Sequence, residues 1–356
     1  MAGGVERMAC TMLEAMRQRG HEMSLLTWDS SSADAFYDIH PSIKWYQLGI
    51  GDPKVKASFM TRLKRALKMR AYLKEAKPDV ILAFQEGTFI STRLYSIGMS
   101  VPVIAAERNA PSRFEHLSAS KYEAIIYQCF RFASAITIQV EAYKEKYPVY
   151  LHDKIISISN PVNKAQKYAM PAGEGKEVKI LLSIGRLSYQ KNYDVLIKAF
   201  SEIADRFPNW RLVIVGEGED RKKLEKIISD NGLGERIFLP GKKNNVDEYY
   251  VSSHFFCLPS RWEGFPNALA EAMAHGLPAV GFEGCSGVAD LIDDGNTGLL
   301  ANGNGEIKAL KLKLEEMMEN EQKRSVMGEQ ACEAIAVYEP SLIFDQWEQL
   351  FNRFMR

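Results

Sequence analysis

Short apolar runs alternate with longer segments of helical periodicity along nearly the whole chain. Continuous apolarity is typical of strands that are buried on both faces, and strands separated by helices form right-handed βαβ units. The pattern therefore predicts an α/β fold with parallel sheets. The expected strands lie near residues 23–28, 80–85, 103–106, 135–140 and 155–159 in the first half, and near 180–184, 212–215, 237–239, 255–258 and 279–282 in the second.

The alternation lapses over one segment that is rich in Pro, Gly and charge, which indicates two domains. A chain of 356 residues is also long for a single core. We expect an N-terminal Rossmann-like domain over 1–163, a linker over 164–177, a C-terminal Rossmann-like domain over 178–339, and a helix over 340–356 that crosses back to the first domain. Doubly wound domains bind ligands at the C-terminal ends of their strands, so we expect the site in the cleft between the domains.

The beginning of the chain departs from this pattern. A glycine turn at Gly3 and Gly4 opens the first helix, although only Met1 and Ala2 precede it. Such a turn normally follows a strand, so either the first strand of the N-terminal domain is missing or the native start lies upstream of Met1. A hole in a sheet leaves backbone groups unpaired, which favours the second explanation.

The composition excludes several classes of protein. No apolar run reaches the roughly 18 residues that a membrane-spanning helix needs, and the N-terminus lacks the apolar region of a signal peptide. The five cysteines are scattered without a C-x-x-C pair, so we expect a cytoplasmic protein with neither a disulfide framework nor structural zinc. Residues 1–163 hold 21 Lys and Arg against 16 Asp and Glu, and the remainder is correspondingly acidic. This asymmetry suggests that the two domains face different partners.

The segment RWEGFPNALAEAMAHGLP, residues 261–278, places one carboxylate before a helix and another inside it. Pro266 suits the first helical position, and Gly276 suits the position just past the helix end. Glu263 precedes the helix, and Glu271 lies roughly 7 Å beyond its start at about 1.5 Å per residue. This separation is similar to the offset between the pyrophosphate and the ribose of one nucleotide.

Free backbone amides at this helix start, together with the helix dipole, favour a phosphate or a sugar hydroxyl. Glu263, on the preceding loop, would accept hydrogen bonds from sugar hydroxyls. A solvated helix with an incidental acid in its first turn is the alternative, and this segment alone leaves both open. We expect the free amides to be those of Phe265, Asn267 and Ala268, which follow Gly264.

Three other segments end predicted strands or follow them. Arg186 and Lys191 stand five positions apart in SIGRLSYQKN, where two cations suit a diphosphate leaving group; two surface cations on a loop are the alternative. In VIVGEGED, Gly216 and Gly218 would let the backbone approach a ligand closely. In FLPGKKNNV, Lys242 lies in a loop whose main-chain groups could contact a base edge.

Together these segments resemble one family. GRLSYQKN, VGEGED, FLPGK, EGFPNALAE and GVADLIDDGNTGLL are similar in order and spacing to the C-terminal domain of the family-4 retaining glycosyltransferases with the GT-B fold. GGVER, ISNPVN and the last helix extend the resemblance over nearly the whole chain. It implies two doubly wound Rossmann-like domains that face a cleft. The most similar members act in bacterial O-antigen, capsule and N-glycan pathways.

The resemblance also implies roles for individual residues. Arg186 and Lys191 would bind the donor pyrophosphate. Glu263 would contact the transferred sugar and complete the catalytic set, and Glu271 would hold the ribose hydroxyls. The remaining donor contacts would come from Gly3, Gly4, Gly216, Gly218, Lys242, Gly264, Phe265, Asn267 and Ala268.

The implied reaction moves a hexose or N-acetylhexosamine from a UDP-sugar to a lipid-linked oligosaccharide, with retention at the anomeric carbon. The family is thought to use front-face displacement, in which the leaving phosphate helps to take the acceptor proton, and it needs no cofactor. The chain contains no Asp-x-Asp, which disfavours a metal-dependent site. UDP is preferred to GDP by resemblance alone.

One segment departs from the family pattern. Many members carry a histidine after an acid at the end of an N-domain strand, whereas this chain has Glu107, Arg108 and Asn109. These three residues are candidates for the acceptor side, with Arg108 contacting a charged phosphate. An arginine that is paired with a nearby carboxylate is the alternative.

The segment 54–77 contains nine Lys and Arg and one acid, Glu75. Its apolar residues repeat at helical spacing from Phe59 to Leu67. An amphipathic basic helix of this kind would hold the protein peripherally on anionic lipid at the inner face of the cytoplasmic membrane, at about 1 kcal/mol per cation. The alternative is a helix that covers a sheet and exposes a basic face. Nucleic-acid binding is disfavoured because no aromatic residues are interleaved with the charge.

Two other functions use the same features. A GT-B UDP-N-acetylglucosamine 2-epimerase would need more acid and base groups in the cleft than the sequence offers. A non-catalytic sugar-nucleotide or glycan-binding subunit is compatible with a missing strand. Against that second function, the chain keeps Arg186, Lys191, Glu263 and Glu271 together.

Overall fold

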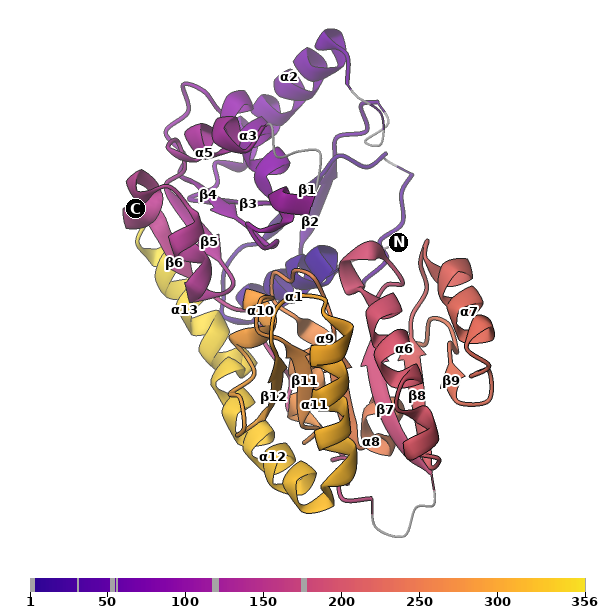
Figure 1. Cartoon of the computed structure of the whole chain (residues 1–356). Helices are drawn as coiled ribbons and strands as arrows, with labels where there is room; N and C mark the ends of the chain where they lie inside the picture. The colour runs from indigo at the N-terminus through magenta and orange to yellow at the C-terminus, as the bar shows by residue number, and fades with distance from the viewer. Residues whose placement is uncertain are drawn as a thin grey trace. The chain divides into compact units, whose positions relative to one another are not determined.

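The structure is a computed structural model that describes residues 4–30, 32–51, 55, 57–116, 122–173 and 178–355 (Figure 1). Its contacts divide the chain into two compact units. The first comprises Met1–Arg108, Phe114–Asn160 and Ser341–Arg356, and the second comprises Asn109–Arg113 and Pro161–Pro340. Of the expected linker, residues 164–173 fall in the second unit, and residues 174–177 lie outside the described residues.

The second unit is built on a parallel six-stranded sheet with the order β12-β11-β10-β7-β8-β9. The strand order reverses beside β7, which pairs with β8 on one side and with β10 on the other. In open α/β sheets, ligands bind outside the carboxyl ends of the strands at such a reversal. The strands are β7 (Lys179–Ile184), β8 (Trp210–Val215), β9 (Ile237–Phe238), β10 (Phe255–Leu258), β11 (Ala279–Phe282) and β12 (Gly298–Ala301).

Both faces of this sheet are covered by helices. Phe255 and Cys257 of β10 belong to one buried cluster, and the alternate residues Phe256 and Leu258 belong to the other. Because each strand is buried on both faces, it reads as a continuous apolar run. The covering helices are α6 (Tyr193–Ser201), α7 (Arg221–Asp230) and α11 (Ile307–Glu319) on one side, and α8 (Asp247–Ser252), α9 (Asn267–Ala274) and α10 (Ser286–Ala289) on the other, with α12 (Glu321–Ala334) reaching both clusters.

The first unit contains two parallel sheets, β1-β2 and β3-β4-β5-β6. The helices α2, α3 and α5 lie side by side on one side of the larger sheet (Figure 1). The strands are β1 (Ser24–Thr27), β2 (Lys44–Gln47), β3 (Ile81–Phe84), β4 (Val103–Ala106), β5 (Ala135–Ile138) and β6 (Ile155–Ser157). The α-helices are α1 (Gly4–Gln18), α2 (Phe59–Ala76), α3 (Glu86–Tyr95), α5 (Glu123–Phe130) and α13 (Pro340–Asn352), with the short helix α4 (Arg113–His116) at the boundary between the units.

The contacts group α13 with the first unit, although it follows the second unit in sequence. Arg19, just after α1, donates to Asp345 at 2.6 Å and to Glu348 at 2.8 Å on α13. The apolar side of this helix is buried, with Trp347 the largest of its buried side chains. Among the helices that the structure describes, none is both long enough and apolar enough to cross a bilayer.

All ten predicted strands are confirmed, and two further strands, β2 and β12, were not predicted. β2 is mostly half-buried and contains the polar residues Lys44 and Gln47, so it lacks a continuous apolar run. β12 begins at Gly298 and lies directly after a turn that includes Gly295 at φ +84°. Its own sequence is typical of a loop, and only its pairing with β11 identifies it as a strand.

Candidate active site

A buried ion pair lies at the carboxyl ends of the two strands that flank the reversal of strand order. Lys191 follows β7, and its Nζ atom lies 2.6 Å from Oε1 of Glu263, which follows β10. The two side chains are only 15% and 8% exposed. Ser260 donates a second hydrogen bond to the same carboxylate oxygen at 2.6 Å. The structure thus brings together two residues that the sequence analysis assigned to one site.

Hydrogen bonds join the two loops that carry this pair. The backbone amide of Arg261 donates to the carbonyl of Gln190 at 2.8 Å, and the side-chain amide of Gln190 donates to the carbonyl of Trp262 at 2.8 Å. The guanidinium of Arg261 also lies 4.4 Å from the ring centroid of Tyr189. These contacts fix the backbone on both sides of the ion pair.

Asn192 makes the turn from the Lys191 loop into α6 possible. Its φ of 57° is left-handed, a conformation that costs most residues roughly 1–2 kcal/mol and that Asn tolerates better. The side chain is fully buried, and neither of its amide atoms has a hydrogen-bond partner within the described parts of the chain. Lys191 therefore immediately precedes a left-handed residue that tertiary packing holds in place.

Arg186 is separate from the buried pair. Its side chain is 70% exposed and its guanidinium lies 3.1 Å from the carboxylate of Glu219. An exposed pair of this kind contributes little to stability, so the guanidinium is available to exchange its partner for a ligand phosphate. The sequence analysis grouped Arg186 with Lys191, whereas the structure places only Lys191 against Glu263.

The helix start after Glu263 differs in detail from the prediction. Helix α9 begins at Asn267, and Pro266 occupies the N-cap position instead of the first helical position. The amide of Asn267 donates to the carbonyl of Phe265 at 2.9 Å, so the expectation that this amide is free is wrong. Within the described chain, the amides of Phe265 and Ala268 have no such partner. The anion-binding amides at this helix start are therefore fewer than expected.

Inside α9, the carboxylate of Glu271 is held by a neighbouring helix. The hydroxyl of Tyr250 on α8 donates to Oε2 of Glu271 at 3.1 Å and lies within 3.1 Å of the carbonyl oxygen of Ala268. The Tyr250 ring stacks on His275 with centroids 4.8 Å apart. Stacking on His275 holds the Tyr250 side chain in place, and the Tyr250 hydroxyl orients the carboxylate of Glu271.

The two glycines after β8 have an intramolecular role. A Cβ atom on Gly216 would lie 1.9 Å from the carbonyl oxygen of Gly185, and one on Gly218 would lie 2.1 Å from that of Leu187. Both glycines therefore allow the loop after β8 to lie against the loop after β7. This packing is a reason of its own for glycine at both positions, and their close approach to a ligand stays a prediction. Lys242 lies exposed in the loop after β9.

Several groups beside the ion pair were not predicted. Ser260 precedes Glu263 by three residues, and the hydroxyl of Tyr193 lies beside Gly185 and the Lys191 stem. Burial, followed by the charge of Glu263, raises the pKa of the Cys285 thiol to about 12, so this cysteine is neutral and unreactive at pH 7. A serine three positions before an acid is too common a pattern to have indicated a role.

The acceptor-side candidates lie at the end of β4. Arg108 is 7% exposed, and its guanidinium lies 5.0 Å from the ring centroid of Trp347 and 5.9 Å from that of Phe84. Burial lowers the pKa of Arg108 to about 9, and the charge of Glu107 opposes this shift. Arg108 is therefore an interior residue of the first unit, and Asn109 is grouped with the second unit.

The remaining predicted contacts can be placed as far as the structure describes them. Gly4 is the first residue of α1, and Gly3 lies outside the described residues. Gly264 is half-buried between Glu263 and Phe265. Among the described residues, no group of three or more His, Cys, Asp or Glu side chains is arranged to hold a metal ion.

Two family descriptions match consecutive parts of the chain. The family "Glycosyltransferase Family 4" matches residues 2–166, and "Glycosyl transferases group 1" matches residues 166–334. A Campylobacter jejuni protein is 27% identical over 98% of this chain and 95% of its own length. It is named GalNAc-α-(1→4)-GalNAc-α-(1→3)-diNAcBac-PP-undecaprenol α-1,4-N-acetyl-D-galactosaminyltransferase.

Solved structures share the fold. Sucrose-phosphate synthase from Thermosynechococcus elongatus has a TM-score of 0.85 at 18% identity, covering 99% of this chain and 94% of its own. The Anabaena protein HepE, solved in complex with UDP and glucose, has a TM-score of 0.78 at 17% identity, covering 98% and 96%. At these identities the likeness concerns the fold, which is GT-B as predicted.

Proposed function

Because this chain belongs to the family-4 glycosyltransferases, we propose that it transfers a hexose or N-acetylhexosamine from a UDP-sugar to a lipid-linked oligosaccharide. The transfer retains the configuration of the anomeric carbon and serves bacterial surface polysaccharide or glycan biosynthesis. The observation that carries this proposal is the buried Lys191–Glu263 pair at the point where the strand order of the second unit reverses. The Campylobacter jejuni relative, named for an undecaprenol-linked acceptor, supports the choice of acceptor.

The positive groups of the site suit a nucleoside diphosphate. Lys191 neutralises charge that grows on the diphosphate as its bond to the sugar breaks, and the exposed Arg186 adds a second cation. Glu271, oriented by Tyr250, accepts hydrogen bonds from the ribose hydroxyls. The neighbour HepE, solved with UDP, supports uridine as the nucleoside.

Glu263 contacts the transferred sugar instead of removing a proton from the acceptor. Its Oε1 atom already accepts hydrogen bonds from Lys191 and Ser260, which hold the carboxylate in place. The acceptor hydroxyl attacks the anomeric carbon from the side on which the diphosphate leaves. The bond from that carbon to the phosphate oxygen breaks, and the same phosphate group takes the acceptor proton. With Lys191, Arg186 and the helix start supplying positive charge, the reaction proceeds without a metal ion.

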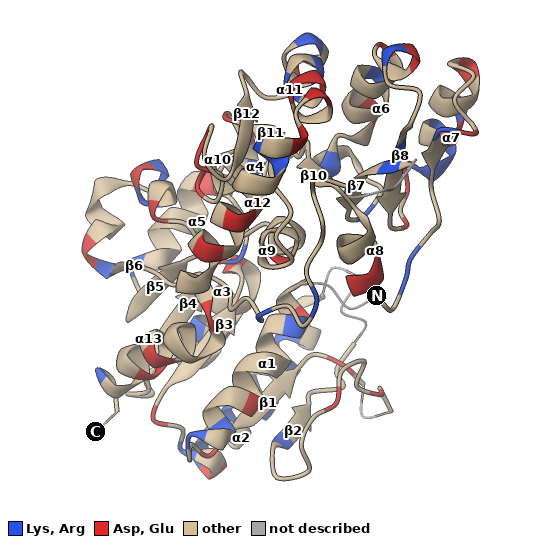
Figure 2. Ribbon diagram, turned by 90° about the horizontal axis from the view of Figure 1, so that it is seen from below, with Lys and Arg blue, Asp and Glu red and all other residues tan. Residues whose placement is uncertain are grey.

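The surface of α2 supports a lipid-linked acceptor. Phe59, Leu63 and Leu67 form an exposed apolar row at helical spacing, with exposed fractions of 80%, 43% and 61%. Arg62 and Lys64 are exposed beside this row, and Figure 2 marks the basic positions along the helix. An apolar row between cations is typical of a helix that lies in an anionic membrane surface.

Other cations of this helix have structural partners. Arg65 donates to the carbonyl of Ile50 at 2.7 Å, and Lys68 donates to that of Leu48 at 2.7 Å. Neutralising Arg62 and Lys64 therefore tests membrane binding without removing these internal hydrogen bonds. We expect weaker partitioning of that variant onto vesicles that contain phosphatidylglycerol, and unchanged partitioning would contradict this role of α2.

The decisive experiment combines a panel of UDP- and GDP-sugars with a synthetic prenyl-diphosphate saccharide, with the linkage of the product read by NMR. We expect one UDP-sugar to be consumed and the product to keep the anomeric configuration of the donor. Inversion, or use of GDP-sugars alone, would overturn the proposal. Release of a 2-epimer from UDP-N-acetylglucosamine without acceptor would identify an epimerase.

Variants connect the activity to the site. Lys191→Ala and Glu263→Ala should each abolish nearly all transfer while the protein stays folded by circular dichroism. Lys226→Ala is the matched control, because Lys226 forms an exposed ion pair with Asp230 at 3.0 Å in the same unit. Full turnover by either site variant would show that the reaction occurs elsewhere.

A further inference from the structure

Large apolar side chains are exposed together on the helices next to α2. Leu94 and Ile97, at the end of α3, are each 59% exposed, and Ile125 of α5 and the following Phe132 are 60% and 66% exposed. We call these four residues the α3–α5 patch. Scattered single exposed apolar residues are normal, whereas a contiguous group marks a surface that binds something.

Contacts between the helices show that the patch is continuous. The side chain of Arg93 on α3 donates to the carbonyl of Phe132 at 3.2 Å, and the buried rings of Phe89 and Phe130 lie 5.5 Å apart between the two helices. The ends of α3 and α5 are therefore adjacent, which brings Leu94 and Ile97 close to Phe132. Ile125 lies near the start of α5 and is connected to Phe132 through Cys129. This adjacency is within the first unit, since all of these residues belong to it.

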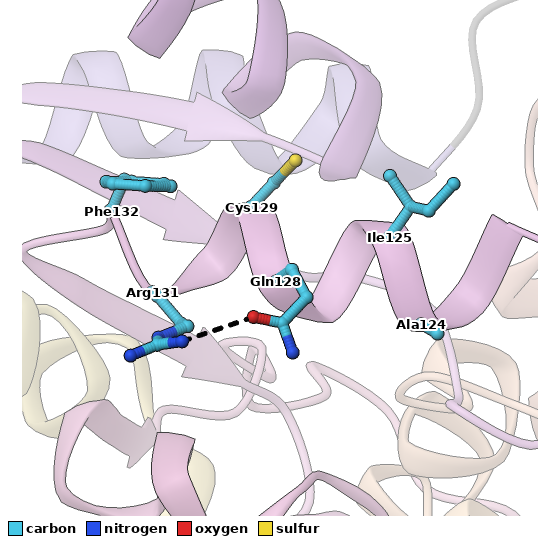
Figure 3. Close-up of a pocket in the computed structure, with 6 residues that line it drawn as sticks. All are labelled: Ala124, Ile125, Gln128, Cys129, Arg131 and Phe132. Atoms are coloured by element: carbon cyan, nitrogen blue, oxygen red, sulfur yellow. Dashed lines mark hydrogen bonds between the residues drawn. The ribbon is translucent and has the colours of Figure 1, made fainter.

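A hollow lies against α5 beside the patch (Figure 3). Ile125 and Cys129 lie four positions apart on one side of α5, and Phe132 in the turn after the helix points the same way in the figure. The lining residues are Ala124, Ile125, Gln128, Cys129, Arg131 and Phe132. The hollow is thus an apolar surface with one cation at its end.

The charge around the patch indicates its partner. Among the exposed residues described over 86–100 and 122–132 there is no acid, and Arg131 supplies a positive charge. Glu123 is half-buried and accepts a hydrogen bond from Tyr127 at 2.9 Å. An apolar surface with cations and without exposed acids complements a bilayer that contains anionic lipid.

The patch also continues into the basic helix. Arg70 of α2 donates to the carbonyls of Tyr95 and Ile97 at 2.9 and 2.7 Å, so the end of α3 is attached directly to α2. Helix α2, which carries the exposed apolar row and the cations, therefore lies in one layer with α3 and α5 (Figure 1).

We propose that the α3–α5 patch is a second membrane-binding site, which enters the lipid interface while α2 supplies the electrostatic attraction. Ile125 and Phe132 enter among the acyl chains, and the hollow against α5 receives a hydrocarbon chain. The proposal extends the lipid-linked acceptor proposed above, but its test does not depend on that function. Apolar insertion persists in salt that screens exposed charges, so the two sites differ in their salt dependence.

Flotation of the whole protein with vesicles tests the patch. The vesicles contain phosphatidylcholine alone or phosphatidylcholine with phosphatidylglycerol. Ile125→Gln with Phe132→Gln should weaken binding to the mixed vesicles at least tenfold at both low and high salt. Leu312→Gln, which changes a 54% exposed residue of the second unit, is the matched control and should bind as wild type.

Further measurements distinguish this proposal from the others. Neutralising Arg62 and Lys64 should weaken binding at low salt only, and the patch variant should keep wild-type transfer to a short water-soluble acceptor. If the patch variant lost that transfer but still bound vesicles, the patch would act in the reaction and not at the membrane, which would overturn the proposal. A patch variant that floats as wild type would overturn it too, as would a change from dimer to monomer, since the patch would then join two copies of the chain.

Discussion

The buried Lys191–Glu263 pair predicts a large and specific loss of stability when one partner is removed. Lys191→Met keeps the length of the side chain and removes its charge. Glu263, whose side chain is 8% exposed, would then hold a buried negative charge to which Ser260 still donates a hydrogen bond. Truncating one partner of a buried pair costs about 3–5 kcal/mol, and the hydrogen bond from Ser260 favours the low end of that range.

We therefore expect Lys191→Met to lower the free energy of unfolding of the second unit by about 3 kcal/mol. A loss of this size corresponds to a fall of roughly 6–12 °C in the melting temperature of a unit of this length. Glu263→Gln on its own should also destabilise, because it leaves the ammonium group without its counter-charge. The double variant should recover part of the loss, since it removes both charges together.

Urea unfolding of the wild type, the two single variants and the double variant gives the coupling energy of the pair. Lys226→Met with Asp230→Asn repeats the cycle on the exposed pair of α7, where we expect a coupling below about 1 kcal/mol. If the Lys191–Glu263 coupling were equally small, solvent would be screening the pair. The argument that the pair holds the two loops rigidly would then fail.

Three further predictions concern the packing around the site. Asn192→Gly should keep or raise the melting temperature, because glycine adopts φ 57° freely and removes a buried amide that has no partner among the described residues, whereas Asn192→Ala should cost about 1 kcal/mol. Gly216→Ala should largely prevent folding of the second unit, while Gly234→Ala, where no described atom lies within 4 Å of the new Cβ, should fold as wild type in circular dichroism. Tyr250→Phe removes the hydrogen bond to Glu271 and should weaken UDP binding roughly fivefold in calorimetry, with equal affinity arguing against a ribose contact.

The strands of the second unit could be predicted because burial on both faces leaves a strong signal. Alternate residues of β10 enter two different clusters, so every position of FFCL must be apolar. β2 has no such constraint, since its residues are exposed or half-buried, and Lys44 pairs loosely with Glu22 at 3.6 Å. Strands of this kind are recognised from their partners and not from their own sequence.

Whether the apolar side of α2 faces the core or the solvent could not be predicted from its own sequence either. The apolar spacing from Phe59 to Leu67 fits either a buried face or an exposed one. Only the position of α2 on the sheet decides between them. Met69 and Leu73 enter a core cluster, whereas Phe59 and Leu67 remain exposed. The alternative of a helix that covers a sheet and exposes a basic face is therefore correct in its covering role, but the outer face is apolar as well as basic.

The pairing of Lys191 with Glu263 depends on the order of the strands, which single motifs do not contain. The two residues are 72 positions apart, and they meet because β7 pairs with β10 although β8 and β9 lie between them in sequence. The hydrogen bonds between Gln190, Arg261 and Trp262 then hold the loops together. A ligand that binds there does not have to order these loops, so more of its binding energy is available for the transition state. A motif can therefore indicate which residues act, but the geometry of the site comes from the sheet that brings the motifs together.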